Sequence, residues 1–215
     1  MKYMEKREKN RLLIAIKEHI RNNLKQYLIV GTLFIIGIII GTAIANNYQE
    51  PANVASNKIL NAIKKINEGY EIDYSGLLKN EIYRQILYAL LLWFLGCSVI
   101  GIPIVYILIS FKGLSLGYTI ATVILALGTP KGTIFVITTL LLQNLLIIPA
   151  TLAIAVSGMN LYSSITKNKK MENIKVEIIR HTVFCSIMLI ILILGVFIET
   201  YVSYFLLKNL AKFFV

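Results

Sequence analysis

Polar residues inside apolar runs are the part of this sequence most able to do chemistry. Gln143 and Asn144 are adjacent within the uncharged run Thr133–Gly158, and Glu199 is the one acidic residue in the last apolar run. Amides and carboxylates are costly to place against lipid, because hydrocarbon offers no hydrogen-bond partner. These side chains therefore predict contacts with other helices. Glu199 fits an ion or proton site, a buried polar bond that fixes helix register, or a side chain that snorkels to the outer interface.

Glycine and proline residues in the apolar runs predict how helices bend and meet. Pro149 lacks a backbone N–H and is expected to bend the run that holds the two amides. Gly101-Ile102-Pro103 is expected to kink the second apolar run. Two Gly-x-x-x-Gly patterns allow close approach of backbones, either within the chain, which is the commoner outcome, or in a homodimer. They are Gly37 with Gly41 and Gly113 with Gly117.

The residue types do not indicate an enzyme. The carboxylates expected on the outer face all lie in one short loop, and the histidines and cysteines form no cluster at metal-ligand spacing. No phosphate-binding loop and no Gly-x-Ser-x-Gly occurs. We therefore expect a non-catalytic protein without cofactor or metal. The net charge of +11 does not indicate nucleic acid, because the basic residues mostly flank apolar runs, where they orient membrane proteins.

The apolar runs themselves predict an all-α, polytopic membrane helix bundle. Hydrophobic residues make up 57% of the chain and the mean hydropathy is +0.71, as in multi-pass proteins. A single membrane domain is predicted over residues 28–215. Its five transmembrane helices are predicted at residues 28–45, 86–109, 114–128, 133–158 and 182–207.

The third predicted span is short for a bilayer, and its links to its neighbours are short as well. One link is Phe111–Gly113, which contains Lys112, and the other is Thr129–Gly132. Such short links place consecutive helices side by side. Spans two, three and four are therefore expected to form a tight antiparallel zigzag.

Basic residues predict the orientation. Residues 1–27 contain eight and residues 159–181 contain five, an excess over the segments of the opposite side that favours an inner N-terminus and an outer C-terminus. Residues 1–27 also space leucine and isoleucine at helical intervals. That pattern fits either an amphipathic helix on the inner leaflet of the membrane or a basic lead-in that only sets topology.

The segment 46–81 is the only sizeable outer loop in this arrangement. We expect it to contain a short extracytoplasmic helix near residues 55–67. One face of that helix is apolar. This face either packs on the membrane surface or on the bundle, or it docks an extracytoplasmic partner. Its residues are Ile59, Ile63 and Ile66.

Several short segments together resemble the stage II sporulation protein M family. In chain order they are Trp93–Gly96, Gly101–Pro103, Phe111–Gly113 with Gly117, Gln143–Ala150 and Ile198–Ser203. The resemblance covers nearly the whole chain. It implies a multi-pass membrane anchor of endospore-forming bacteria, located in the mother-cell septal or engulfing membrane.

The same resemblance implies partners and a role. The partners are stage II sporulation protein D, a lytic transglycosylase, and stage II sporulation protein P, an amidase/endopeptidase. With them, the family thins septal peptidoglycan and moves the mother-cell membrane around the forespore. We therefore expect a scaffold that recruits, localises or activates these hydrolases. The alternative is a transporter or channel subunit, which Glu199, the Gln143-Asn144 pair and the prolines would suit.

Overall fold

The computed structural model describes residues 18, 20–68, 74–98, 100–167, 171–203 and 205, and all regular structure in this part of the chain is helical. The all-α prediction is therefore confirmed. Four helices are long and apolar enough to cross a membrane, which agrees with a membrane protein. They are α2 (Leu24–Asn47), α5 (Gly101–Leu127), α7 (Leu142–Lys167) and α8 (Met171–Phe197).

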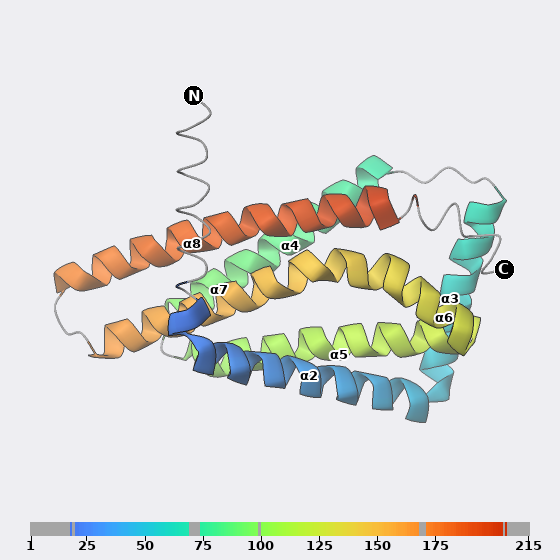
Figure 1. Ribbon diagram of the computed structural model, residues 1–215, viewed down its shortest axis with the longest axis horizontal. Helices are drawn as coiled ribbons and strands as arrows, with labels where there is room; N and C mark the ends of the chain where they lie inside the picture. The colour runs from blue at the N-terminus through green and yellow to red at the C-terminus, as the bar shows by residue number, and fades with distance from the viewer. Residues whose placement is uncertain are drawn as a thin grey trace.

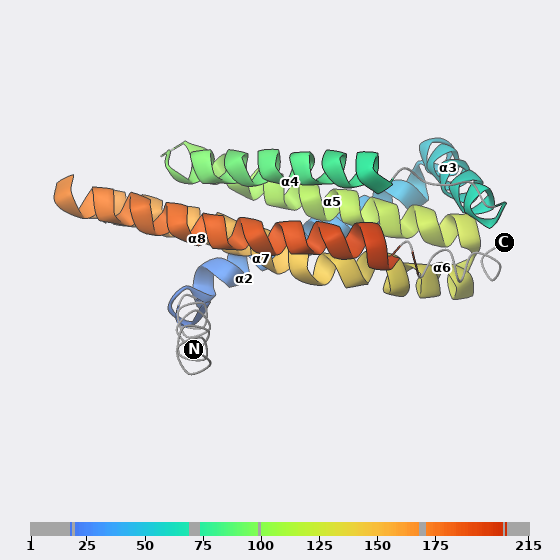
Figure 2. The same ribbon diagram turned by 90° about the horizontal axis from the view of Figure 1, so that it is seen from above.

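The total of five spans stays a prediction, because it requires one span besides these four. The candidate is α4 (Tyr74–Gly96), which lies alongside the others (Figure 1 and Figure 2) but carries Lys79, Glu81 and Arg84 in its first half. The orientation also stays a prediction. The orientation is predicted from the basic residues of 1–27 and 159–181, and these outnumber the basic residues of the opposite side whether or not Lys112 is counted with them.

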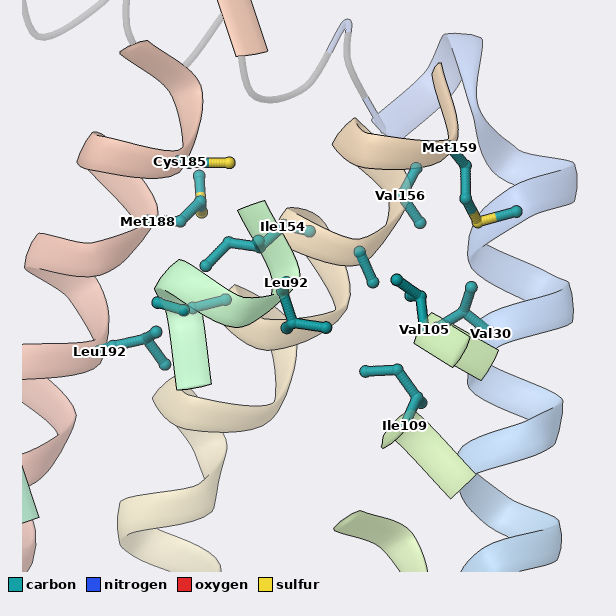
Figure 3. Packing of buried hydrophobic residues seen from close by; sticks show 14 of the residues in the cluster. Val30, Leu92, Val105, Ile109, Ile154, Val156, Met159, Cys185, Met188 and Leu192 are labelled. Carbon is teal, nitrogen blue, oxygen red and sulfur yellow. The ribbon is translucent and has the colours of Figure 1, made fainter. Parts of the chain in front are cut away.

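The helices form one elongated bundle with α7 at its centre (Figure 1 and Figure 2). The apolar window of α7 is 61% buried, against 28–33% for the other three spans. Side chains of α2, α4, α5 and α8 meet those of α7 in the core. Figure 3 shows Val30 of α2, Leu92 of α4, Ile109 of α5, Ile154 of α7 and Leu192 of α8. The outward faces expose many leucine, isoleucine and phenylalanine side chains, as lipid-facing surfaces do.

The predicted second span is wrong, because the chain turns within residues 86–109. The turn separates α4 from α5: the Ser98 amide donates to the Leu95 carbonyl at 3.1 Å, and the Gly101 amide donates to the Ser98 carbonyl at 3.2 Å. A Cβ on Gly101 would collide with the Leu95 carbonyl, so this close turn needs glycine. Gly101-Ile102-Pro103 therefore begins α5 and does not kink a continuous span; proline is tolerated in a first helical turn.

The predicted link at Phe111–Gly113 is wrong as well. These residues lie inside α5, a helix of 27 residues. Such a helix is about 40 Å long at 1.5 Å per residue. The short third span, 114–128, is its second half, so the zigzag of three spans becomes the antiparallel pair α4 and α5 followed by α7. Lys112 consequently lies within the bundle and not in an inner loop.

The chain leaves α5 at Gly128, whose φ of 76° favours glycine. α6 (Thr129–Phe135) follows, with Pro130 in its first turn. α6 continues through a π-helical segment, η1 (Val136–Leu141), into α7, and α8 continues into a second one, η2 (Ile198–Ser203). The stretch from α6 to α7 arches in Figure 1. π segments are rare and are frequent at functional sites.

α3 (Gln49–Asn67) lies across one end of the bundle (Figure 1 and Figure 2) and is longer than the predicted helix over 55–67. The Ser56 hydroxyl donates to the Thr122 carbonyl of α5 at 3.1 Å. Ile63 and Ile66 are buried and Ile59 is half-buried. The apolar face thus packs within the chain, and these isoleucines are not exposed as the predicted docking surface.

The predicted amphipathic segment 1–27 falls mostly outside the described residues, which omit 1–17 and 19. Ile20 and Leu24, at its end, are exposed. Residues 204 and 206–215, including the end of the predicted fifth span, also lie outside the described part.

Candidate functional site

A cavity of about 470 Å³ within the bundle is lined by several polar and charged side chains of the apolar helices. Helices α2, α4, α5 and α7 and both π segments contribute to its wall. Lys112, Asn144 and Glu199, three residues that the sequence singles out, meet there. The full lining is Phe34, Arg84, Gln85, Tyr88, Leu108, Phe111, Lys112, Ser115, Leu116, Thr119, Leu140, Asn144, Ile147, Ile148 and Glu199.

Lys112 is held by neutral groups. Its Nζ donates to Thr151 Oγ1 at 3.3 Å, and the Thr151 hydroxyl donates in turn to the Ile147 carbonyl at 2.7 Å. The same Nζ lies 4.5 Å from the centre of the Tyr88 ring, a cation–π distance. The Tyr88 hydroxyl donates to the Leu108 carbonyl at 3.1 Å, which fixes the ring one turn before Lys112. α4, α5 and α7 thus position one ammonium group deep in the bundle.

Three other charged residues lie close enough to interact electrostatically with Lys112. They are Arg84, Glu199 and Glu81. Arg84 and Lys112 lie at a similar depth, each about 17–18 Å from the α4–α5 turn at 1.5 Å per residue. Arg84 Nη2 pairs with Glu81 Oε2 at 2.7 Å, and the Arg84 side chain is 69% exposed. Glu199 lines the cavity from η2. Ionisable groups at membrane depth are costly and usually functional.

Asn144 binds within its own helix. Its Nδ2 donates to the Leu140 carbonyl at 2.8 Å, the last turn of η1. The sequence predicts that this amide contacts another helix. Its Nδ2 instead pairs with a carbonyl of the same helical stretch, where the π segment changes to α-helix. The Gln143 side chain lies outside the described residues. Pro149 is inside α7 as expected, on an exposed side away from the cavity.

On the other side of α5, the two Gly-x-x-x-Gly patterns pack against each other. The Thr42 hydroxyl donates to the Gly117 carbonyl at 3.3 Å across this seam. These four glycines pack within the chain, the commoner of the two predicted outcomes. A homodimer stays a prediction. A Cβ would collide with a facing backbone carbonyl at each glycine: Gly37 with Ser110, Gly41 with Leu114, Gly113 with Phe34 and Gly117 with Ile38.

A second polar group, which the sequence does not single out, joins α7 to α8. Ser157 Oγ lies 2.8 Å from His181 Nδ1, and both residues are buried. Beside them Gly96 and Gly158 approach so closely that a Cβ on Gly96 would meet the Gly158 Cα at 2.7 Å. Trp93 Nε1 donates to Thr182 Oγ1 at 3.1 Å nearby. These contacts fix the crossing of α4, α7 and α8.

Sequence reasoning missed the partners that make Lys112 notable. Tyr88 and Thr151 lie in predicted spans and carry no signal of their own. Arg84 and Glu199 line the same cavity from α4 and η2. The usable signal was a lone lysine with apolar turns on both sides.

A family model described as stage II sporulation protein M matches residues 30–204. The match includes the glycine seam, the cavity and α3. Comparison with curated proteins and with solved structures gives no match. The chain therefore belongs to the stage II sporulation protein M family.

Proposed function

We propose that this protein is a non-catalytic membrane scaffold that recruits, localises and activates peptidoglycan hydrolases for septal wall thinning and engulfment. The observation that carries the proposal is the family match over residues 30–204, since membership implies a role in sporulation. The partners that the family resemblance implies are the lytic transglycosylase and the amidase/endopeptidase, stage II sporulation proteins D and P. Both act outside the membrane, so the scaffold needs an outer surface of fixed shape.

α3 supports this proposal as the platform. Its buried side is fixed to the bundle by Ala52, Ser56 and Ile63. Its opposite side is exposed, polar and basic, with Lys58, Lys64 and Lys65. A basic surface favours a partner with an acidic patch, because complementary charge speeds encounter and sets register. We therefore propose the lysine side of α3, in place of the buried isoleucine side, as the docking surface.

Charge reversal tests the platform without removing α3. Lys58, Lys64 and Lys65 are all changed to glutamate, and the two hydrolases are co-purified from membranes of sporulating cells. We expect capture to fall strongly, since each contact changes from attraction to repulsion. The matched control is Lys175→Glu, an exposed lysine of α8 near the opposite end of the bundle. Full capture of both hydrolases by the triple variant at normal expression contradicts the platform.

A second candidate function, a transporter or channel subunit, is favoured by one observation: the cavity gathers Lys112, Arg84 and Glu199. A transport path needs several ionisable groups at membrane depth. Ion or proton flux into proteoliposomes, with wild type and Glu199→Gln, separates the candidates. Flux that the substitution abolishes supports transport. Absence of flux from wild type that still captures the hydrolases supports the scaffold.

A further inference from the structure

The Lys112 cavity opens through the side of the bundle. α4 and α5 lie together at their turn and separate toward their other ends (Figure 1). Lining residues that are also exposed mark the mouth, and these are Arg84 on α4 with Phe111 and Ser115 on α5. Phe111 is 64% exposed, on a surface that also exposes Leu87 and Ile107. Such an apolar surface on a spanning helix faces lipid, so the mouth is reached from the bilayer.

At the inner end of this opening is a cation with unused donors. The Lys112 ammonium has three N–H groups. Within the described part of the chain one donates to Thr151, the Tyr88 ring covers another side, and no carboxylate lies within 4.0 Å of Nζ. A positive charge held this way attracts an anion strongly, because the surroundings screen it poorly. Arg84, at a similar depth, adds a second cation at the mouth; its Nη2 pairs with Glu81 Oε2 at 2.7 Å, and its guanidinium has further N–H donors.

We propose that this cavity binds the phosphodiester headgroup of an anionic membrane lipid, with its phosphate between Lys112 and Arg84. Phosphate oxygens are the acceptors that lysine and arginine bind most strongly. The apolar lining, including Leu116 and Ile148, accommodates the lipid next to the phosphate. Glu199 lines the same cavity, and its carboxylate favours a singly charged phosphodiester over free dianionic phosphate. The site is independent of the scaffold function, because it requires no hydrolase.

Lipid titration of the purified full-length protein tests this proposal. Native mass spectrometry compares the affinity for phosphatidylglycerol with that for phosphatidylcholine, whose headgroup is neutral overall. Both lipids carry the phosphodiester, but the quaternary ammonium of phosphatidylcholine is repelled by Lys112 and Arg84. Wild type should therefore bind phosphatidylglycerol about tenfold more tightly. Lys112→Gln should remove that preference, while Lys112→Arg, which keeps the cation, should retain it. Lys175→Gln, an exposed lysine of α8 outside the cavity and outside the proposed docking face, is the matched control and should bind as wild type does.

Inorganic phosphate distinguishes the source of the anion. If millimolar phosphate leaves bound phosphatidylglycerol in place, the ligand is the lipid headgroup as proposed. If it displaces the lipid, the anion site stands but soluble phosphate is its ligand, and the lipid assignment is overturned. The proposal also fails if wild type does not prefer phosphatidylglycerol, or if Lys112→Gln keeps the preference. Helical circular dichroism and size-exclusion profiles confirm that each variant is folded.

Discussion

The two sides of α5 differ at neighbouring residues: one side packs closely against α2, and the other side lines a cavity. Gly113 and Gly117 meet the backbone of α2 so closely that no side chain fits. Lys112, one residue away, carries a charge into a polar cavity of about 470 Å³. Close backbone packing is a main source of stability between membrane helices, since lipid competes with apolar side chains. The glycine seam is therefore expected to hold the fold, and the cavity to serve binding at little benefit to stability.

The largest effect is expected in the seam. Gly113→Ala should lower the free energy of unfolding by about 3 kcal/mol, because its Cβ meets the Phe34 carbonyl and α2 must move away. Unfolding in mixed micelles, followed by the fluorescence of Trp93, the single tryptophan, measures this. Gly31→Ala adds the same methyl group to α2 where nothing lies within 4 Å, so it should cost nothing. Equal stability of the two variants would mean that the seam does not hold the bundle.

The Ser157–His181 contact is expected to come next. Ser157→Ala removes the 2.8 Å partner of His181 Nδ1 at a buried crossing, and the Cys185 thiol, 3.6 Å from the same nitrogen, is a weaker partner. We expect a cost of about 1–2 kcal/mol. The same unfolding assay applies, with Ser186→Ala as control. Ser186 is exposed and its hydroxyl only donates to the Thr182 carbonyl of its own helix. A Ser157→Ala variant as stable as the control would place water or another donor at His181.

The seam was open to prediction and the cavity was not, for physical reasons. Glycines spaced by four residues signal backbone contact wherever the helices meet. The α4–α5 turn carries no such signal, because it is built from apolar residues that hydropathy reads as part of a span. Lys112-Gly113 gives the reverse error. A charge beside a glycine reads as a loop, yet the glycine fits α2 and the charge is placed by Tyr88 and Thr151.

α3 shows a related limit. The spacing of Ile63 and Ile66 indicates that one face is apolar, but it does not say what covers that face. In the structure these side chains are buried within the chain. The Ser157–His181 contact could not be predicted for the same reason, because the sequence does not show which helices lie next to each other.

A smaller effect is expected at Asn144, at the edge of the cavity. Asn144→Leu removes the 2.8 Å bond to the Leu140 carbonyl at the end of η1. Such polar bonds in membrane helices average about 0.6 kcal/mol, so stability should fall by roughly that amount. Thr166→Val, which removes a similar bond to its own helix at an exposed site, is the control. A loss above about 2 kcal/mol would indicate that Asn144 also joins two helices, as an interhelical clasp would.

The smallest effect on stability is expected at Lys112, although its loss should abolish lipid preference. Lys112→Met removes a charge that is costly to bury and keeps a chain of similar length. Thr151 Oγ1 then no longer accepts a hydrogen bond from Lys112, but its hydroxyl still donates to the Ile147 carbonyl. The free energy of unfolding should stay within about 0.5 kcal/mol of wild type or rise. Lys58→Met, on the exposed face of α3, is the control for removing a lysine charge. If Lys112→Met instead costs as much as Gly113→Ala, both sides of α5 hold the fold, and the polar cavity is a structural network and not a binding site.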